Sequence, residues 1–345
     1  MTGYILFEDG TVLKGTAFGK TDTVIGYLSF HTEMAGYENY LFSPVNHGKV
    51  MAMTFPLIGA YGFLETDGGK GRPKAVIAKG FEKHPSHYQN EKDIKTVFEE
   101  KGIFGLGGVD TRNLTRIIRD YGKAKVMLTC EEITEESLEK LRSFKLVDNV
   151  TAEMSVKEHK IIGSGEKSIG ILDLGDGENL AKFLERYGVK SHVFPYNTSA
   201  GEILTNGLGA LIASTGGGGI GSVSEAVECL KALEGKAKIY GIGLGFIALA
   251  KALSCDIYQM SAGHRGGNYP VLEHSTGKVL ITSQNIGEAI VGEAIPQGID
   301  ITHINVNDNV VEGIKTDSCE GVSFELKPDI ASGKCIILEK WLEVL

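Results

Sequence analysis

The second half of the chain alternates short apolar runs with stretches of helical periodicity. The apolar runs predict strands at Ser168–Leu174, Lys190–Tyr196, Leu208–Ser214 and Lys238–Ile242, and the stretches between and after them predict helices at Asn179–Tyr187, Ser222–Leu233 and Leu244–Leu253. This alternation is typical of a parallel sheet covered on both faces. Four later segments predict antiparallel strands before a final helix: Val279–Ser283, Thr302–Val306, Val311–Lys315 and Ser323–Leu326.

The first ~145 residues mix short strands and turns with a few helices. Gly3–Phe18 and Val24–Phe30 have the pattern of strands, and Glu91–Glu100 and Glu131–Phe144 that of amphipathic helices. Asp110 is placed to cap a further helix with apolar residues at helical spacing. The whole pattern predicts an α/β protein with one domain at residues 1–150, a polar linker at 151–167 and a second domain at 168–345.

Composition limits the classes of function. The 345 residues are 42% hydrophobic and 23% charged, which is typical of a globular protein. The net charge of -9, without a basic block, argues against a nucleic-acid partner. The N-terminus lacks the pattern of a signal peptide, and no apolar run reaches membrane-spanning length. The five cysteines form no C-x-x-C pair, so we expect free, mostly buried thiols in a reducing cytosol. The expected location is therefore cytoplasmic, and Cys335 is expected in the C-terminal helix.

The segment Ala237–Ala250 indicates the candidate site. It consists of a buried strand, a tight glycine turn and an apolar helix, with Gly243 at the apex. Such a turn raises one side chain above a sheet and beside a helix N-terminus, where a nucleophile is exposed and activated. Glycine has no side chain, so covalent catalysis cannot take place at this position. A second glycine cluster, Gly216–Gly221, lies at the end of another strand, on the sheet edge where such folds bind ligands.

Several long motifs follow one another along nearly the whole chain. They are Phe30–Glu38, Phe55–Gly62, Gly108–Arg116, Gly263–Val271, Thr282–Asn285, Thr302–Asp308 and Val311–Gly313. In this order they resemble the small, glutamine-hydrolysing subunit of carbamoyl phosphate synthetase. The resemblance implies an N-terminal α/β domain unique to this subunit and a C-terminal class I glutamine amidotransferase domain, flavodoxin-like with a mainly parallel sheet. It also implies a role in arginine or pyrimidine biosynthesis.

This chain departs from the family's pattern at the three positions of the catalytic triad. The family uses a cysteine nucleophile, a histidine base and a glutamate that orients the histidine. The family elbow reads G-I-C-L-G-H-Q, which places Gly243 at the nucleophile and Phe246 and Ile247 at the polar pair. The family's H-P-E motif corresponds to Lys327-Pro328-Asp329, which places Lys327 at the base and Asp329 at the orienting residue. Lysine is normally protonated at neutral pH and is a poor base.

The family's glutamine pocket also matches only in part. The serine of the N-terminal half corresponds to Val45, and the aromatic residue of Q-N-H-G-F corresponds to Glu288. The positions that the resemblance assigns to a relic of the substrate pocket are Val45, Gly216, Gly218, Leu244, Ile247, Asn285, Gly287 and Glu288. The family motif D-F-G-x-K-x-N is present only as Asp173-Leu174-Gly175 and Asn179, with Gly177 at its lysine.

Other patterns have competing interpretations. Gly216–Gly221 satisfies G-x-G-x-x-G, but the next strand does not end in an acidic residue, which favours an oxyanion-loop relic over a dinucleotide site. His264 and His303 lack the spacing of a metal site, which favours a structural or interface role. Lys327 and Asp329 could form a new acid–base pair, but a partly exposed ion pair of small energetic weight is the favoured interpretation. The charges of the helix after Asp110, at Arg112, Arg116 and Arg119, indicate either a partner surface or one solvated helix face.

The leading hypothesis is a small-subunit homologue without glutaminase activity, a structural or regulatory partner of a large subunit that uses ammonia. ATP and Mg²⁺ would then belong to the large subunit, and this chain would hold no cofactor or metal. The first alternative is a stand-alone binding protein whose pocket is lined by Val45, Phe246, Ile247 and Glu288. The second is an active glutamine-hydrolysing subunit.

Overall fold

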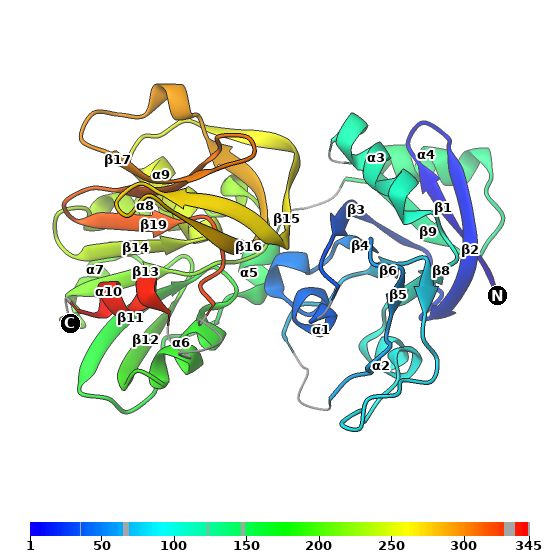
Figure 1. The fold of residues 1–345 in the computed structure, drawn as a ribbon, viewed down its shortest axis with the longest axis horizontal. Helices are drawn as coiled ribbons and strands as arrows, with labels where there is room; N and C mark the ends of the chain where they lie inside the picture. The colour runs from blue at the N-terminus through cyan, green and yellow to red at the C-terminus, as the bar shows by residue number, and fades with distance from the viewer. Residues whose placement is uncertain (35, 65–68, 123, 146–148, 328–334, 344–345) are drawn as a thin grey trace. The chain divides into compact units, whose positions relative to one another are not determined.

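The computed structural model divides the chain into two compact units, Met1–Val147 and Asp148–Leu345. It describes residues 1–34, 36–64, 69–122, 124–145, 149–327 and 335–343. The two units are shown in Figure 1, coloured from the N-terminus to the C-terminus. Each unit has its own sheet and its own apolar core. The division falls before the linker that the sequence predicts at residues 151–167.

The first unit is built on a closed barrel in the strand order β1-β2-β8-β6-β4-β3-β9. These strands are β1 (Thr2–Phe7), β2 (Val12–Gly19), β8 (Phe104–Gly107), β6 (Ala75–Ile77), β4 (Val50–Met53), β3 (Val24–His31) and β9 (Lys125–Thr129). The single strand predicted at Gly3–Phe18 is a hairpin, because Asp9 accepts a hydrogen bond from the Thr11 N–H at 2.8 Å and Gly10 turns with φ +90°. A small sheet pairs β5 (Leu57–Ile58) with β7 (Gly80–Phe81).

Helices pack against this barrel and begin where side chains cap their first N–H groups. They are α1 (Tyr37–Leu41), the 3₁₀ turn η1 (Pro44–Asn46), α2 (Ile94–Lys101), α3 (Thr111–Tyr121) and α4 (Glu135–Ser143). The Asp110 carboxylate accepts hydrogen bonds from the N–H groups of Arg112 and Asn113, both at 3.1 Å, which confirms the predicted cap. Helices α2 and α4 begin later than predicted, since Asp93 and Thr134 provide the caps.

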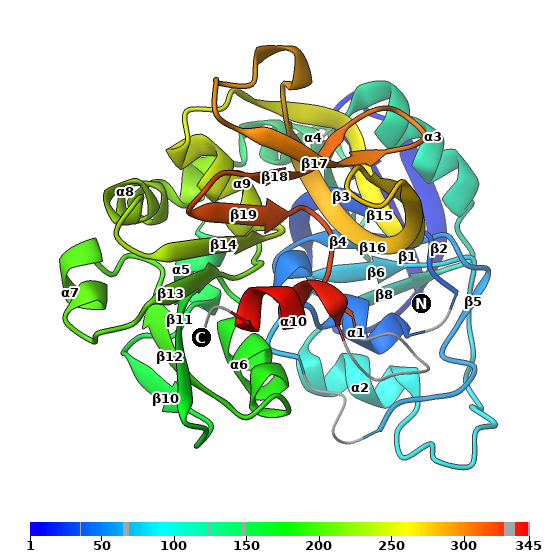
Figure 2. The same cartoon turned by 60° about the vertical axis from the view of Figure 1, so that its left-hand side comes forward.

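The second unit contains a ten-stranded sheet whose central strands are parallel. Strands β12 (Val189–Pro195), β11 (Lys167–Asp173), β13 (Ala210–Ala213), β14 (Lys238–Ile242) and β19 (Cys319–Val322) follow one another in this order (Figure 2). The helices of this half are α6 (Gly177–Glu185), α7 (Ala200–Leu204), α8 (Ser224–Leu233) and α9 (Leu244–Ala252), with the 3₁₀ turn η2 (Ile220–Ser222) before α8. The predicted strand–helix alternation and the glycine clusters at the strand ends are confirmed.

The other strands of this sheet are antiparallel and flank the parallel centre, and three of them contain most or all of the antiparallel strands predicted at Val279–Ser283, Thr302–Val306 and Val311–Lys315. They are β18 (Val311–Lys315), β16 (Lys278–Ile290), β15 (Ile257–Glu273) and β17 (Asp300–Asn305), with β10 (Lys160–Ile162) at the other edge. The prediction of a strand at Ser323–Leu326 was wrong. The observed strand, β19, lies just before it and ends at Val322. It pairs in parallel with β14 and antiparallel with β18. Its sequence, Cys-Glu-Gly-Val, has no apolar alternation that would mark it.

The predicted linker is part of the second unit. Helix α5 (Val150–Met154) and strand β10 lie within or next to residues 151–167, and β10 pairs with β12. The buried Thr151 hydroxyl donates to the Gly217 carbonyl at 2.9 Å, and the Val156 N–H donates to the Asp173 carboxylate at 2.8 Å. These contacts, rather than long helical or strand periodicity, hold the segment against the sheet.

The C-terminal part and the cysteines agree largely with expectation. The 3₁₀ turn η3 (Gly292–Ala294) follows β16, and the last helix is α10 (Ile336–Leu342). Cys335 lies at the N-cap of α10 rather than inside it. All five cysteines are free and all but Cys130 are buried. Burial raises the pKa of the Cys229 thiol to about 11. Within the described residues, no helix is long and apolar enough to cross a membrane.

Candidate functional site

The turn between β14 and α9 has the geometry of a nucleophile elbow. Gly243 is the residue before the first turn of α9 and has φ +57° and ψ -116°. Its N–H donates to the Val322 carbonyl on the neighbouring strand β19 at 3.0 Å, and its carbonyl accepts from the Ile247 N–H at 3.2 Å. The apex is therefore fixed both to the sheet and to the helix. A residue held this way stands at the helix N-terminus, where a thiolate would be stabilised.

The flanking glycines allow the helix to approach the sheet. A Cβ on Gly245 would lie 2.8 Å from the Ser214 carbonyl oxygen, and a Cβ on Gly241 would lie 2.8 Å from Phe246 Cα. Both distances are too short for real atoms, so the close packing of α9 on β13 and β14 requires glycine at these two positions. The G-x-G-x-G spacing around Gly243 thus has a structural reason that does not depend on catalysis.

The space above the apex is occupied. A Cβ at Gly243 would lie 3.0 Å from Thr215 Cβ and would clash more severely with the Thr215 hydroxyl oxygen. Thr215 comes from the loop after β13, which corresponds to the family's oxyanion loop. Any side chain at position 243 would therefore require Thr215 to move. At the position predicted for the nucleophile, a side chain would compete with Thr215 for space.

A carboxylate lies on the glycine loop. Glu288 Oε2, from strand β16, accepts a hydrogen bond from the Ile220 N–H at 2.8 Å, and a Cβ at Gly219 would lie 2.8 Å from Glu288 Oε1. Backbone N–H groups of such loops bind anions. Here the anion is the chain's own Glu288, which stands where the family has an aromatic residue. The loop leads into η2 and then α8, and Gly218 has φ +94°.

Lys327, at the position predicted for the base, is engaged by two neighbouring side chains. Its ammonium donates to Ser283 Oγ at 2.9 Å and lies 3.3 Å from Glu325 Oε2. The Lys327 side chain is half exposed, which is the setting of an ion pair of small energetic weight. Asp329, the predicted orienting residue and the expected ion-pair partner of Lys327, lies outside the described residues.

The remaining predicted pocket positions divide between the two units. Phe246 and Ile247 are buried in the core of the second unit, at 0% and 2% exposure, together with Leu244. Val45 lies in η1 of the first unit and is also buried. Asn285 and Gly287 lie on β16, and the Gly287 carbonyl accepts from the Gln259 side-chain amide. Buried core side chains give no support to the alternative of a pocket lined by Phe246 and Ile247.

The Asp173 motif has a structural role in this chain. The buried Asp173 carboxylate accepts from the N–H groups of Gly175 at 2.8 Å and Gly177 at 2.7 Å, besides that of Val156. A Cβ at Gly177 would lie 2.8 Å from the Asp173 carboxyl carbon, so a larger residue at position 177 would require a local shift. Asn179 donates to the Asp176 side chain at 2.7 Å.

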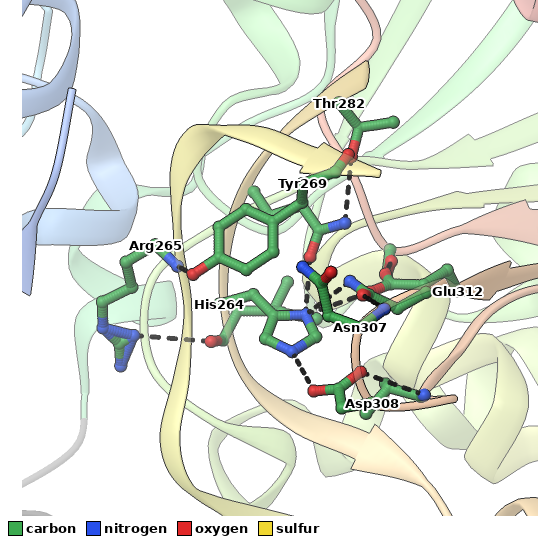
Figure 3. A network of polar contacts seen from close by, with 12 residues as sticks. His264, Arg265, Tyr269, Thr282, Asn307, Asp308 and Glu312 are labelled. Atoms are coloured by element: carbon green, nitrogen blue, oxygen red, sulfur yellow. Dashed lines mark hydrogen bonds and ion pairs between the residues drawn. The ribbon is translucent and has the colours of Figure 1, made fainter. Parts of the chain in front are cut away.

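A buried polar network surrounds His264 on strand β15 (Figure 3). His264 Nδ1 lies 3.0 Å from Glu312 Oε1 and 2.7 Å from Gln284 Oε1, and His264 Nε2 lies 2.7 Å from Asp308 Oδ2. The Glu312 carboxylate is 0% exposed and also accepts from Asn305 Nδ2 at 3.1 Å. Sequence reasoning gave His264 a structural or interface role but did not connect it with Glu312. The one sequence feature that links the two residues is that each belongs to a motif of the family resemblance, Gly263–Val271 and Val311–Gly313.

Electrostatics favour a protonated His264. Burial alone lowers the pKa of this imidazole, but the hydrogen bonds and negative charges of Glu312 and Asp308 outweigh it, and the net shift is upward. The Tyr269 ring stacks on His264 with centroids 4.7 Å apart, and its hydroxyl accepts the Arg265 N–H at 2.9 Å. His303 is not part of the network around His264. Its Nδ1 and the Thr302 hydroxyl form a hydrogen bond at 2.9 Å. Among the described residues, no group of three or more His, Cys, Asp or Glu could hold a metal ion.

The sheet, elbow and glycine loop of the second unit are those of the class I glutamine amidotransferases. The model of this family, "Glutamine amidotransferase class-I", matches residues 171–324. The model "Carbamoyl-phosphate synthase small chain, CPSase domain" matches residues 5–128. Together with the relatives below, these matches show that the chain belongs to the carbamoyl phosphate synthase small chain family.

Similar curated proteins are themselves named carbamoyl phosphate synthase small chains. The carbamoyl phosphate synthase small chain of Clostridium acetobutylicum is 37% identical over 341 residues, 96% of each chain. That of Listeria innocua is 34% identical and covers 95% of this chain and 92% of its own. That of Akkermansia muciniphila is 32% identical and covers 96% and 94%. The predicted resemblance is thereby confirmed over nearly the full length.

Proposed function

We propose that this chain is a carbamoyl phosphate synthase small chain without glutaminase activity, which serves as a structural or regulatory partner of a large chain that uses free ammonia. The observation that carries the proposal is the elbow itself. Gly243 has the backbone of a nucleophile position but no side chain, and Thr215 occupies the space where one would stand. Without a nucleophile no acyl-enzyme can form at this position.

Two further contacts support the proposal. Glu288 occupies the Ile220 N–H of the glycine loop, so this donor is not available to a substrate oxyanion while the contact holds. Lys327 donates a hydrogen bond to Ser283 and pairs with Glu325, so its ammonium is engaged by two neighbouring side chains. The partner in this proposal is the family's large chain, which would hold ATP and Mg²⁺ and would carry out the synthesis in the cytoplasm.

The proposal predicts which nitrogen donor the complex uses. Purified with the large chain of the same organism, this protein is expected to support carbamoyl phosphate synthesis from ammonium and ATP, with no gain when glutamine replaces ammonium. The measurement is the rate of carbamoyl phosphate formation with each donor, with an active small chain from a relative as the control. Synthesis driven by glutamine at a rate comparable to that control would overturn the proposal.

Covalent labelling gives a second expected result. A glutamine analogue that carries an electrophile labels the elbow cysteine of an active amidotransferase. The segment Lys238–Lys251 contains no cysteine, so mass spectrometry is expected to find no adduct in it. Labelling of the half-buried Cys130 would be non-specific and should not be prevented by excess glutamine. A stoichiometric adduct elsewhere in the second unit that glutamine prevents would reveal another nucleophile and contradict the proposal.

A further inference from the structure

The outer face of helix α3 carries three arginines, for which the sequence left open a partner surface or one solvated helix face. Leu114 and Ile118 are buried on the inner face of α3, whereas Arg112, Arg116 and Arg119 are exposed at the spacing i, i+4, i+7. The three guanidinium groups therefore project from one side of the helix. Arg119 pairs at 3.1 Å with the adjacent Asp120, an exposed contact of small weight.

The position of these arginines is locally unfavourable. Arg112 lies in the first turn of α3, where the helix dipole disfavours a positive charge. Arg112 and Arg116 are like charges four residues apart and repel each other. Among the described residues, no carboxylate lies within ion-pair distance of either. The nearby Asp110 is engaged with the first N–H groups of the helix. A solvated face would be more stable with neutral or acidic residues here.

We propose that this arginine face, formed by Arg112, Arg116 and Arg119, docks on a carboxylate-rich surface of the large chain. The proposal rests on the function proposed above. A charge arrangement that weakens the isolated helix is explained when a partner supplies the missing negative charge. Arginine suits this role because its planar guanidinium binds carboxylates with two parallel hydrogen bonds.

The alternatives fit less well. The net charge of -9 repels nucleic acid, which needs a larger basic surface. A small anion requires a concave site with buried polar groups, and the outer face of an exposed helix provides neither. A protein surface with clustered Asp and Glu can contact all three exposed arginines along the helix at once. Docking is then expected to depend on salt, since exposed charges across an interface act mainly on the association rate.

The test measures binding of the full chain to the purified large chain by surface plasmon resonance at low and high salt. Arg112→Glu/Arg116→Glu is expected to raise Kd at least tenfold and to flatten its salt dependence. Arg112→Gln/Arg116→Gln is expected to lie between wild type and the reversal. The matched control, Lys140→Glu/Lys231→Glu, changes net charge equally at two exposed helix positions and should bind like wild type. Thermal unfolding is expected to show that the arginine variants are as stable as wild type or more so.

The outcomes are distinguishable. If wild type binds and both arginine variants bind equally well, the docking face is wrong while the proposed function stands. If the lysine control weakens binding as much as the reversal, the effect is one of net charge, and the docking face is again wrong. If wild type does not bind the large chain at all, the proposed function fails and the docking face with it.

Discussion

Gly243→Cys is expected to leave glutamine hydrolysis undetectable while lowering stability. The new side chain would have to stand at φ +57°, a conformation that costs a non-glycine residue about 1–3 kcal/mol. It would also displace Thr215, whose Cβ lies 3.0 Å from the position of the added Cβ. For a unit of this size each kcal/mol lowers Tm by about 2–4 °C, so we expect a loss of several degrees.

The chemical reason for inactivity is independent of the strain. A thiol at the N-terminus of α9 would be partly ionised and would react with electrophiles. The leaving ammonia still needs a proton, and the position predicted for the base holds Lys327 instead of a histidine, the side chain suited to proton exchange near neutral pH. Triad members act as a unit, so repair of one gives little of the whole effect. Adding Lys327→His and Asp329→Glu should give weak activity at most, until Val45→Ser and Glu288→Phe restore the family's pocket.

Two control variants separate strain from chemistry. Gly243→Ala measures the cost of a side chain at the apex without a thiol. Gly243→Cys/Thr215→Gly removes the clash and is expected to recover part of the lost Tm and to label with the electrophilic glutamine analogue, still without turnover. The assays are thermal unfolding, mass spectrometry of the adduct and steady-state release of glutamate. Robust turnover by Gly243→Cys alone would mean that only the nucleophile had been lost.

The elbow was predictable because it is local in sequence. A buried strand, three glycines and an apolar helix within Ala237–Ala250 are sufficient to define the turn, and the structure confirms its geometry. The side chains that contact the elbow and the glycine loop were not predictable in the same way. Glu288 reaches Ile220 across 68 residues, and Thr215 meets Gly243 only through the packing of two neighbouring strands. Such contacts depend on register, which apolar periodicity does not specify at glycine-rich ends.

The same distinction explains the errors in the fold. Residues 151–167 contain few apolar positions, so their docking through Thr151 and Val156 left no periodic signal. Strand β19 is short, and glycine and glutamate interrupt its apolar pattern. Helix α3 was predicted well, because its cap at Asp110 and its apolar spacing are local. The His264 network joins residues from β15, β16 and β18, and only the tertiary structure brings their side chains together.

Removal of the Glu312 carboxylate is expected to cause the largest loss of stability. Glu312→Ala leaves His264, Asn305 and Ser323 without the buried acceptor that all three contact. Loss of one partner from a buried ion pair costs roughly 3–5 kcal/mol, a large part of a typical total stability of about 5–15 kcal/mol. Glu312→Gln keeps the volume and should be milder. Asp308→Ala removes the other carboxylate, which is 44% exposed, and is expected to cost about 1 kcal/mol or less.

The loss of unfolding free energy in Glu312→Ala is also expected to depend on pH, and its direction follows from the pKa of His264. The pKa of His264 is raised in the folded state, so its charged interactions stabilise the fold fully below the unfolded pKa of about 6.5. This contribution disappears as pH rises through the higher folded pKa. The difference in unfolding free energy between wild type and Glu312→Ala is therefore expected to be larger at about pH 6 than at about pH 9. Denaturant unfolding at the two pH values, with Asp308→Ala as the exposed counterpart, measures it. A loss that is the same at both pH values would show that Glu312 acts through packing and neutral hydrogen bonds rather than through the charge of His264.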